Sequence, residues 1–176
     1  MMIGELAAEF ELMDIDGVTR RLADYAGEIV MLDFWSAECP WSAHYDGWLS
    51  QQAALWARQG IHLLAIASNV NETAAFIGQA IAERGITFPV LLDHDCAVAD
   101  LFDAVTTPHI FVIDPAGRLA YRGAIDDRSF RQRVATVNYL EQALVALQKG
   151  DQPDPAETAS YGCTVVRPIR EEGLPA

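Results

Sequence analysis

An apolar strand that leads directly into a cysteine at a helix start is the feature that most constrains this chain. Residues 28–35 form a nearly continuous apolar run, which predicts a central strand covered on both faces. Cys39 follows, and Pro40 suits a first helical turn, where its missing N–H removes no hydrogen bond. Unpaired N–H groups and the positive end of the helix dipole favour a thiolate there. The sequence therefore predicts a reactive Cys39 and not a cysteine that only packs.

The residues on either side of Cys39 resemble the thioredoxin superfamily. Residues 33–36 read Asp-Phe-Trp-Ser and precede Cys39 at the superfamily's spacing, but Ser42 stands where Cys-x-x-Cys has its second cysteine. The chain thus carries a monothiol version, Cys-Pro-Trp-Ser. Residues 107–119, which begin Thr107-Pro108, look like the corresponding segment of the redoxin branch, the alkyl hydroperoxide reductase and thiol-specific antioxidant-like proteins. The resemblance implies a cis Thr107-Pro108 bond facing Cys39, with its backbone available to a bound peptide or disulfide.

Length, charge and cysteine content narrow the class of protein. A chain of 176 residues with 51% apolar content can form one domain with a sizeable core. The net charge of −13 argues against nucleic-acid partners and anionic membranes. The start lacks a signal-peptide pattern and no long apolar stretch occurs, so a cytoplasmic protein is expected. Three widely spaced cysteines favour redox or catalytic use over a disulfide framework.

The order of predicted elements indicates one α/β domain over residues 1–150. Strands are predicted at 9–15, 18–22, 28–35, 61–67, 89–92, 110–113 and 119–122, and helices at 40–58, 72–84, 97–102 and 130–149. Strand, helix, strand requires a parallel pair, and the final hairpin makes the sheet mixed. With the resemblance, this predicts a thioredoxin-like three-layer fold with an N-terminal hairpin extension. Residues 151–176, rich in proline and charge, are predicted to be an extended C-terminal tail.

Several side chains near Cys39 are candidate site residues. The resemblance implies that Asp33 helps to move protons at the thiol, and burial would raise the pKa of its carboxyl group. Trp41 is expected to offer an apolar contact to a partner. Ser42 cannot resolve a mixed disulfide, but its hydroxyl could donate a hydrogen bond to the Cys39 sulfur. Glu38 carries a charge that would oppose thiolate formation.

Two other cysteines are candidate resolving thiols. Cys163 lies in the tail within a Gly-Cys segment, which resembles the end of some bacterial redoxin-domain proteins. Cys96 precedes a short predicted helix, where a cysteine without a partner is the favoured interpretation. The sequence leaves the pairing open, because Cα separations decide which cysteines can be joined. The scattered histidines and cysteines show no metal-ligand spacing, so neither a metal nor a cofactor is expected.

Three functions are compatible with these residues. The favoured one is a thiol-disulfide oxidoreductase acting on a disulfide-bearing protein or small disulfide, with another cysteine or an external thiol such as glutathione resolving the mixed disulfide at Cys39. The second is an antioxidant peroxidase of the peroxiredoxin type, in which a hydroperoxide oxidises Cys39. Ser36 fits that type, but Leu32 replaces its proline and Pro108 its peroxide-orienting arginine. The third is a non-catalytic binding protein that keeps the fold.

Overall fold

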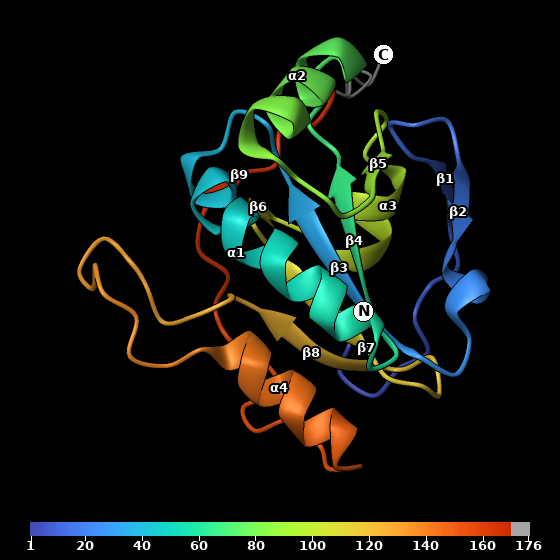
Figure 1. Ribbon diagram of the computed structural model, residues 1–176, viewed down its shortest axis with the longest axis vertical. Helices are drawn as coiled ribbons and strands as arrows, with labels where there is room; N and C mark the ends of the chain where they lie inside the picture. Colours follow the sequence, from blue (N-terminus) through green and yellow to red (C-terminus); the bar gives the residue numbers. More distant parts are fainter. Residues whose placement is uncertain (170–176) are drawn as a thin grey trace, which may run out of the picture.

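A mixed five-stranded sheet forms the centre of the molecule (Figure 1). The computed structural model describes residues 1–169. Its central strands, in spatial order, are β5 (Val90–Leu92), β4 (Ile61–Ala67), β3 (Ile29–Trp35), β7 (Ile110–Ile113) and β8 (Leu119–Gly123). The β3–β4 and β4–β5 pairs are parallel, whereas β3–β7 and β7–β8 are antiparallel. The predicted mixed sheet is therefore confirmed.

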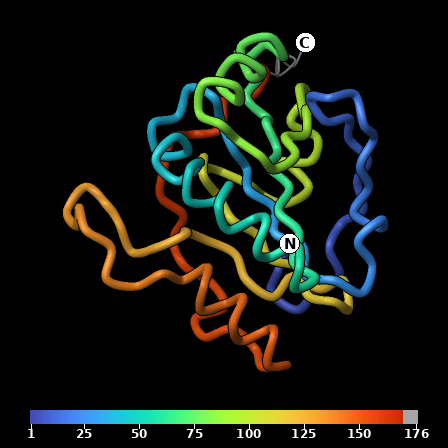
Figure 2. Tube along the Cα trace, viewed as in Figure 1, coloured from blue at the N-terminus to red at the C-terminus, as the bar shows by residue number. Residues whose placement is uncertain are grey.

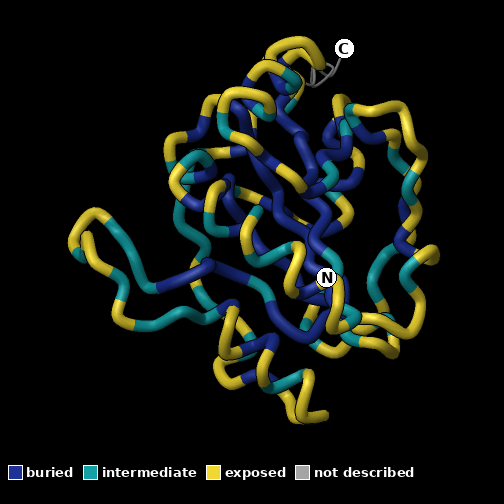
Figure 3. The backbone as a smooth tube through the Cα atoms, viewed as in Figure 1, coloured by how far each residue is buried: buried dark blue, intermediate teal, exposed yellow. Residues whose placement is uncertain are grey.

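Helices cover both faces of this sheet. They are α1 (Pro40–Ala57), α2 (Ala74–Arg84), α3 (Ala97–Phe102) and α4 (Tyr139–Gln148). Met31 and Trp35 of β3 belong to the core shared with α1, α2 and α4, while Leu32 and Phe34 belong to the core shared with α3. Successive strand residues point to opposite faces, so the continuous apolar run of β3 fills both cores. Figure 3 shows this buried sheet between more exposed helices, which is the predicted three-layer arrangement.

The N-terminal segment forms a small separate hairpin. Strands β1 (Glu11–Met13) and β2 (Thr19–Arg21) pair antiparallel, and the short 3₁₀ helix η1 (Leu22–Tyr25) follows. The buried carboxylate of Asp14 accepts the backbone N–H groups of Asp16 and Val18, which closes the turn. The hairpin is shorter than predicted, and its strands lie outside the central sheet.

The predicted helix over residues 130–149 was wrong in its first half. Helix α4 begins at Tyr139, after Asn138 accepts the N–H of Glu141 as an N-terminal cap. The preceding residues form a long loop that projects from the body in Figure 1. Phe130 and Val134 have helical spacing, but each is 73% exposed and neither belongs to the core. Without an apolar face to bury, the segment gains too little from packing to form a helix.

The C-terminal tail runs along the body as an extended segment (Figure 2). Its backbone first pairs with Arg122 in β8, through the N–H of Thr158 and the carbonyl of Ala156. It then forms β9 (Cys163–Thr164), which pairs antiparallel with β6 (Thr106–Thr107). Residues 170–176 of the predicted tail lie outside the described residues. Within residues 1–169, no helix combines the length and apolar character needed to cross a membrane.

Candidate active site

Cys39 is the N-terminal cap of α1 and lies between the end of strand β3 and the start of this helix. Its N–H donates to the Ser36 hydroxyl at 3.1 Å, and its thiol donates to the carbonyl oxygen of Thr107 at 2.9 Å. Only 1% of the residue is exposed. The Thr107-Pro108 bond is cis, as the resemblance implied, and its loop lies against Cys39. Strand β3 and this loop therefore place the thiol at the edge of the core.

The structure brings Cys163 to Cys39 across 124 residues of sequence. Cys163 pairs with Thr107 in the β6–β9 register. The sulfur atoms of Cys39 and Cys163 are 2.9 Å apart. Gly162 makes this approach possible, because a Cβ atom there would lie 2.1 Å from the carbonyl oxygen of Thr107. A glycine directly before the second cysteine is thus required by the close passage of the two backbones. Both cysteines are free thiols.

The two thiols differ in acidity. Burial raises the pKa of Cys39, but hydrogen bonds with Cys163, with Thr107 and with the backbone of Ser42 outweigh it, and the pKa is lowered overall. Burial and the hydrogen bond to Cys39 raise the pKa of Cys163 to about 12. Cys39 is therefore the better nucleophile, because the thiolate is the attacking form. The Ser42 hydroxyl accepts the N–H of Ser36 at 3.4 Å, and the backbone of Ser42 hydrogen-bonds with Cys39.

Asp33 lies in β3 with no exposed surface. Neither of its carboxyl oxygens has a hydrogen-bond partner among the described residues. Burial, followed by the charges of Asp46 and Cys39, raises the pKa of this carboxyl group well above its usual range. Burial thus favours the protonated acid. A buried carboxylic acid whose charge interacts with the thiol is suited to exchange a proton with it.

Asp33→Asn is expected to stabilise the protein increasingly as the pH rises. The carboxyl group of Asp33 stays protonated in the folded state at pH values above about 4, at which the unfolded chain has lost this proton. The free energy of unfolding of the wild-type protein therefore falls as the pH rises from about 4 towards the raised pKa of folded Asp33. Asparagine does not titrate, so the stability gain of the variant should grow by at least about 1 kcal/mol between pH 4 and pH 8. Urea unfolding followed by circular dichroism at both pH values measures this. A gain that is the same at both values would contradict it.

Glu72 holds the loop in front of Cys39, a role that the sequence did not reveal. Its buried carboxylate accepts hydrogen bonds from the Ser36 hydroxyl at 2.5 Å and from the N–H groups of Ala37 and Glu38 at 3.0 and 3.1 Å. Asn69 donates to the same carboxylate at 3.2 Å. The predicted helix began at Glu72, where an acidic residue is ordinary. Because α2 begins only at Ala74, Glu72 is free to reach this loop.

Asn69 connects this carboxylate to the tail. Its side-chain oxygen accepts the N–H of Val166 at 2.9 Å, and the N–H of Val70 donates to the Val166 carbonyl at 3.1 Å. Val166 lies three residues beyond Cys163. Glu72 and Asn69 therefore couple the loop that carries Cys39 to the strand that carries Cys163.

The remaining predicted residues have diverse surroundings. Trp41 is partly exposed, and its ring centroid lies 4.8 Å from that of Tyr161. Glu38 is exposed and accepts a hydrogen bond from Asn71. Cys96 is buried, its thiol donates to the carbonyl of Ser68 at 2.8 Å, and burial raises its pKa. Its thiol also lies 3.7 Å from the carbonyl oxygen of Val166 in the tail. Of the two candidate resolving thiols, the structure places Cys163 against Cys39, whereas Cys96 contacts backbone carbonyls.

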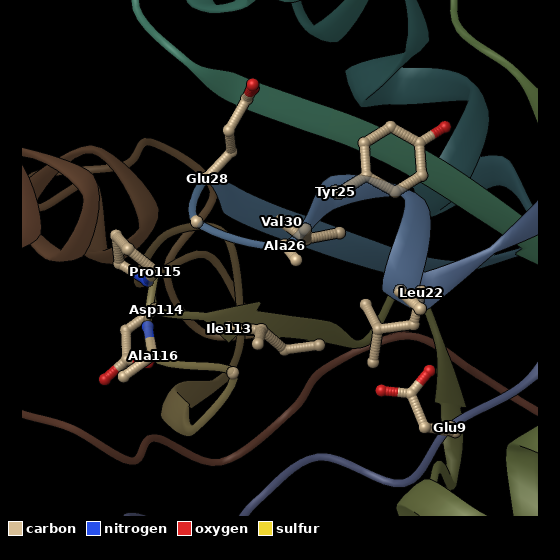
Figure 4. Close-up of a pocket in the computed structure, with 13 residues that line it drawn as sticks. Glu9, Leu22, Tyr25, Ala26, Glu28, Val30, Ile113, Asp114, Pro115 and Ala116 are labelled. Carbon is tan, nitrogen blue, oxygen red and sulfur yellow. The ribbon is translucent and has the colours of Figure 1, made fainter.

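A pocket shown in Figure 4 lies away from these cysteines. It has a volume of about 160 Å³ and is bounded by η1, the start of β3 and the turn between β7 and β8. Leu22, Tyr25 and Ile113 provide apolar walls, and Glu9 and Glu28 add carboxylates. None of the residues around Cys39 lines it. The candidate site is thus the surface around the two thiols and not this pocket.

Comparison with known proteins places the chain in a family. Residues 3–122 match the AhpC/TSA family. The chain belongs to the AhpC/TSA family. The matched region contains the site's β3, Cys39, Glu72 and the Thr107-Pro108 loop, whereas Cys163 lies beyond it.

Individual relatives extend the comparison. The thiol-disulfide oxidoreductase ResA of Geobacillus thermodenitrificans is 29% identical over 117 residues, which cover 66% of each protein. This chain therefore spans slightly less than two thirds of that relative's length. The structure of a hypothetical protein from Sinorhizobium meliloti 1021 has 30% identity and a TM-score of 0.87, with 97% of both chains covered, so that match extends into the tail.

The fold is also that of a known thioredoxin domain. The thioredoxin domain of a thiol-disulfide oxidoreductase from Bacteroides vulgatus superimposes with a TM-score of 0.63 at 21% identity, covering 76% of this chain and 93% of that domain. This likeness concerns the fold. Together with the family match, it confirms the predicted thioredoxin-like fold of the redoxin branch.

Proposed function

We propose that this protein is a thiol-disulfide oxidoreductase in which Cys39 attacks a disulfide and Cys163 resolves the mixed disulfide. The observation that carries the proposal is the 2.9 Å approach of the two sulfur atoms, held by the pairing of Cys163 with Thr107. The relatives named thiol-disulfide oxidoreductase ResA support the same chemistry. The intramolecular second thiol takes the place of the cysteine that Ser42 replaces.

The reaction follows from the difference in acidity of the two thiols. The Cys39 thiolate attacks one sulfur of the substrate disulfide, whose other sulfur leaves as a thiolate and takes up a proton. Cys163 then gives up its proton and attacks the Cys39 sulfur, which releases the second substrate thiol and leaves a Cys39–Cys163 disulfide. Two electrons have passed to the substrate. In this proposal Asp33, a buried carboxyl group whose pKa is raised by burial and by the charges of Asp46 and Cys39, gives or accepts a proton as the charge at Cys39 changes.

The proposed substrate is a disulfide-bearing protein, and the proposed reductant of the Cys39–Cys163 disulfide is a thiol such as glutathione. Because Cys39 is almost completely buried, the strand β9 has to move aside before a large disulfide can reach the sulfur. The proposed compartment is the cytoplasm, which is consistent with free thiols that form one redox pair and no disulfide framework.

A peroxidase that acts on hydroperoxides is the second candidate, because Cys163 could equally condense with a sulfenic acid on Cys39. In the described residues, the Cys39 sulfur is contacted by Thr107, Cys163 and the backbone of Ser42, and by no cation. Pro108 occupies the place where peroxiredoxins carry arginine. Without a charged donor, peroxide activation is expected to be slow. If stopped-flow measurements showed oxidation of Cys39 by hydrogen peroxide as fast as in a dedicated peroxidase, the peroxidase would become the first candidate.

The proposal predicts a specific cysteine linkage. After mild oxidation of the reduced protein, peptide mass spectrometry is expected to find Cys39 joined to Cys163, with Cys96 still reduced, because Cys96 is buried against Ser68. The protein should also catalyse thiol-dependent reduction of hydroxyethyl disulfide, a small neutral substrate. A dominant link through Cys96, or the absence of any Cys39–Cys163 link, would overturn the assignment of the resolving thiol.

A further inference from the structure

The loop between β8 and α4 carries an exposed group of basic and apolar side chains. Residues 128–134 contain three arginines and no acidic residue, in a protein whose net charge is −13. Arg131 and Arg133 are exposed, and Phe130 and Val134 are each 73% exposed. The loop therefore presents positive charge and apolar surface, although most charged residues of the whole protein are acidic.

The acidic residues at the base of this loop are used inside it. Asp126 accepts hydrogen bonds from the Tyr45 hydroxyl at 2.8 Å and from the N–H of Arg128 at 2.9 Å. The carboxylate of Asp127 accepts the N–H groups of Thr136 and Val137 at 2.8 and 3.1 Å. These bonds fix the two ends of the loop to each other. The two carboxylates thus bind the loop's backbone and the Tyr45 hydroxyl, whereas Arg131 and Arg133 are exposed to solvent.

This loop is physically continuous with the candidate active site. The Phe130 ring lies 6.4 Å from that of Trp41 and 5.3 Å from that of Tyr161, measured between centroids. Trp41 is two residues after Cys39, and Tyr161 is two residues before Cys163. A hollow of about 280 Å³ between α1 and the loop, lined in part by Trp48, Arg128 and Ala135, adds a concave region. The aromatic rings of Trp41, Tyr161 and Phe130 therefore connect the neighbours of the two cysteines to the loop.

We infer that the surface formed by Trp41, Phe130, Arg131, Arg133 and Val134, called here the arginine-loop surface, docks an acidic polypeptide segment that carries the disulfide attacked by Cys39. The inference rests on the proposed function and adds the class of substrate. Acidic side chains of the partner meet the two arginines, and an apolar side chain covers Phe130 and Val134. Interfaces favour arginine and aromatic residues in this combination, and complementary charge speeds encounter.

The test compares substrates that differ only in charge. Two synthetic peptides share one internal disulfide and are flanked either by aspartate and glutamate or by lysine, and hydroxyethyl disulfide serves as a neutral probe too small to reach the loop. Wild-type protein is expected to reduce the acidic peptide with the higher kcat/KM. In Arg131→Glu/Arg133→Glu, kcat/KM for the acidic peptide should fall about tenfold or more, since exposed charges mainly affect encounter. The rate with hydroxyethyl disulfide should stay unchanged.

Matched variants separate the local effect from net charge. Arg58→Glu/Lys149→Glu makes the same change in net charge at exposed positions after α1 and α4, and should leave the peptide preference within about twofold. Arg131→Gln/Arg133→Gln should give an intermediate loss, and raised salt should weaken the wild-type preference.

Three outcomes would overturn the inference. Equal rates for the two peptides would remove the charge preference, and an equal loss in both double glutamate variants would make it a property of net charge. Sedimentation that shows a wild-type dimer dissociated by the arginine-loop substitutions would make the surface a contact between copies of this chain. A wild-type protein that does not reduce hydroxyethyl disulfide would instead contradict the proposed function itself.

Discussion

Replacing Cys163 with serine is expected to lower multiple-turnover disulfide reduction by about 100-fold or more while Cys39 still forms a mixed disulfide with the substrate. In the native protein the resolving sulfur lies 2.9 Å from Cys39, so the second exchange step is intramolecular. Serine cannot displace the bound thiol, and an external thiol has to do so without the advantage of fixed proximity. Intact mass spectrometry should show the trapped adduct, and steady-state reduction of hydroxyethyl disulfide measures the loss.

Two further cysteine variants complete this experiment. Cys39→Ser is expected to abolish both adduct formation and turnover, because it removes the attacking thiolate. Cys96→Ser is the matched control and should retain turnover, since the Cys96 thiol contacts the carbonyls of Ser68 and Val166 and a serine hydroxyl can donate to the same oxygens. Undiminished turnover in Cys163→Ser would show that an external thiol resolves the intermediate directly. Loss of turnover in Cys96→Ser, with the fold intact, would show that the resolving role had been assigned to the wrong cysteine.

Gly162→Ala is expected to displace β9 from β6 and to slow formation of the Cys39–Cys163 disulfide by about tenfold or more. The added Cβ would lie 2.1 Å from the Thr107 carbonyl oxygen and 2.7 Å from its carbon, both backbone atoms that no side-chain rotation can clear. Overpacking of this kind costs about 1–3 kcal/mol. The tail can relieve the clash by moving away, so the rest of the domain should stay folded.

The displacement of β9 can be followed at both thiols. In reduced Gly162→Ala protein, alkylation of Cys39 by iodoacetamide should become faster, because the residue is 1% exposed in the native structure and β9 lies against it. Gly47→Ala is the control, since a Cβ atom at that position in α1 meets nothing within 4 Å and alanine favours helix. Wild-type rates of disulfide formation in Gly162→Ala would contradict the proposed role of the β6–β9 contact.

The local sequence pattern was sufficient to predict the strands and the helix that position Cys39. The strand at β3, the strand at β4 and the helix that begins at Pro40 were predicted within one or two residues of their observed bounds. Their apolar residues repeat with the period of the structure they form, so the signal lies within each short segment. The Thr107-Pro108 segment was recognised by its resemblance to redoxins. Sequence alone thus determined the fold, the position of Cys39 at the start of the helix and the loop that faces it.

Only the tertiary structure decided what surrounds that thiol. The sequence favoured a Cys96 without a partner and gave Cys163 a redoxin-like Gly-Cys context, but it left the pairing open, and the β6–β9 register placed Cys163 against Cys39. Glu72 acts on a loop more than thirty residues away, and the exposed segment around Phe130 has helical spacing without a core to bury it. Each of these outcomes depends on a contact between distant segments. Such contacts are set by packing and strand register, which leave no periodic signal in the segments that make them.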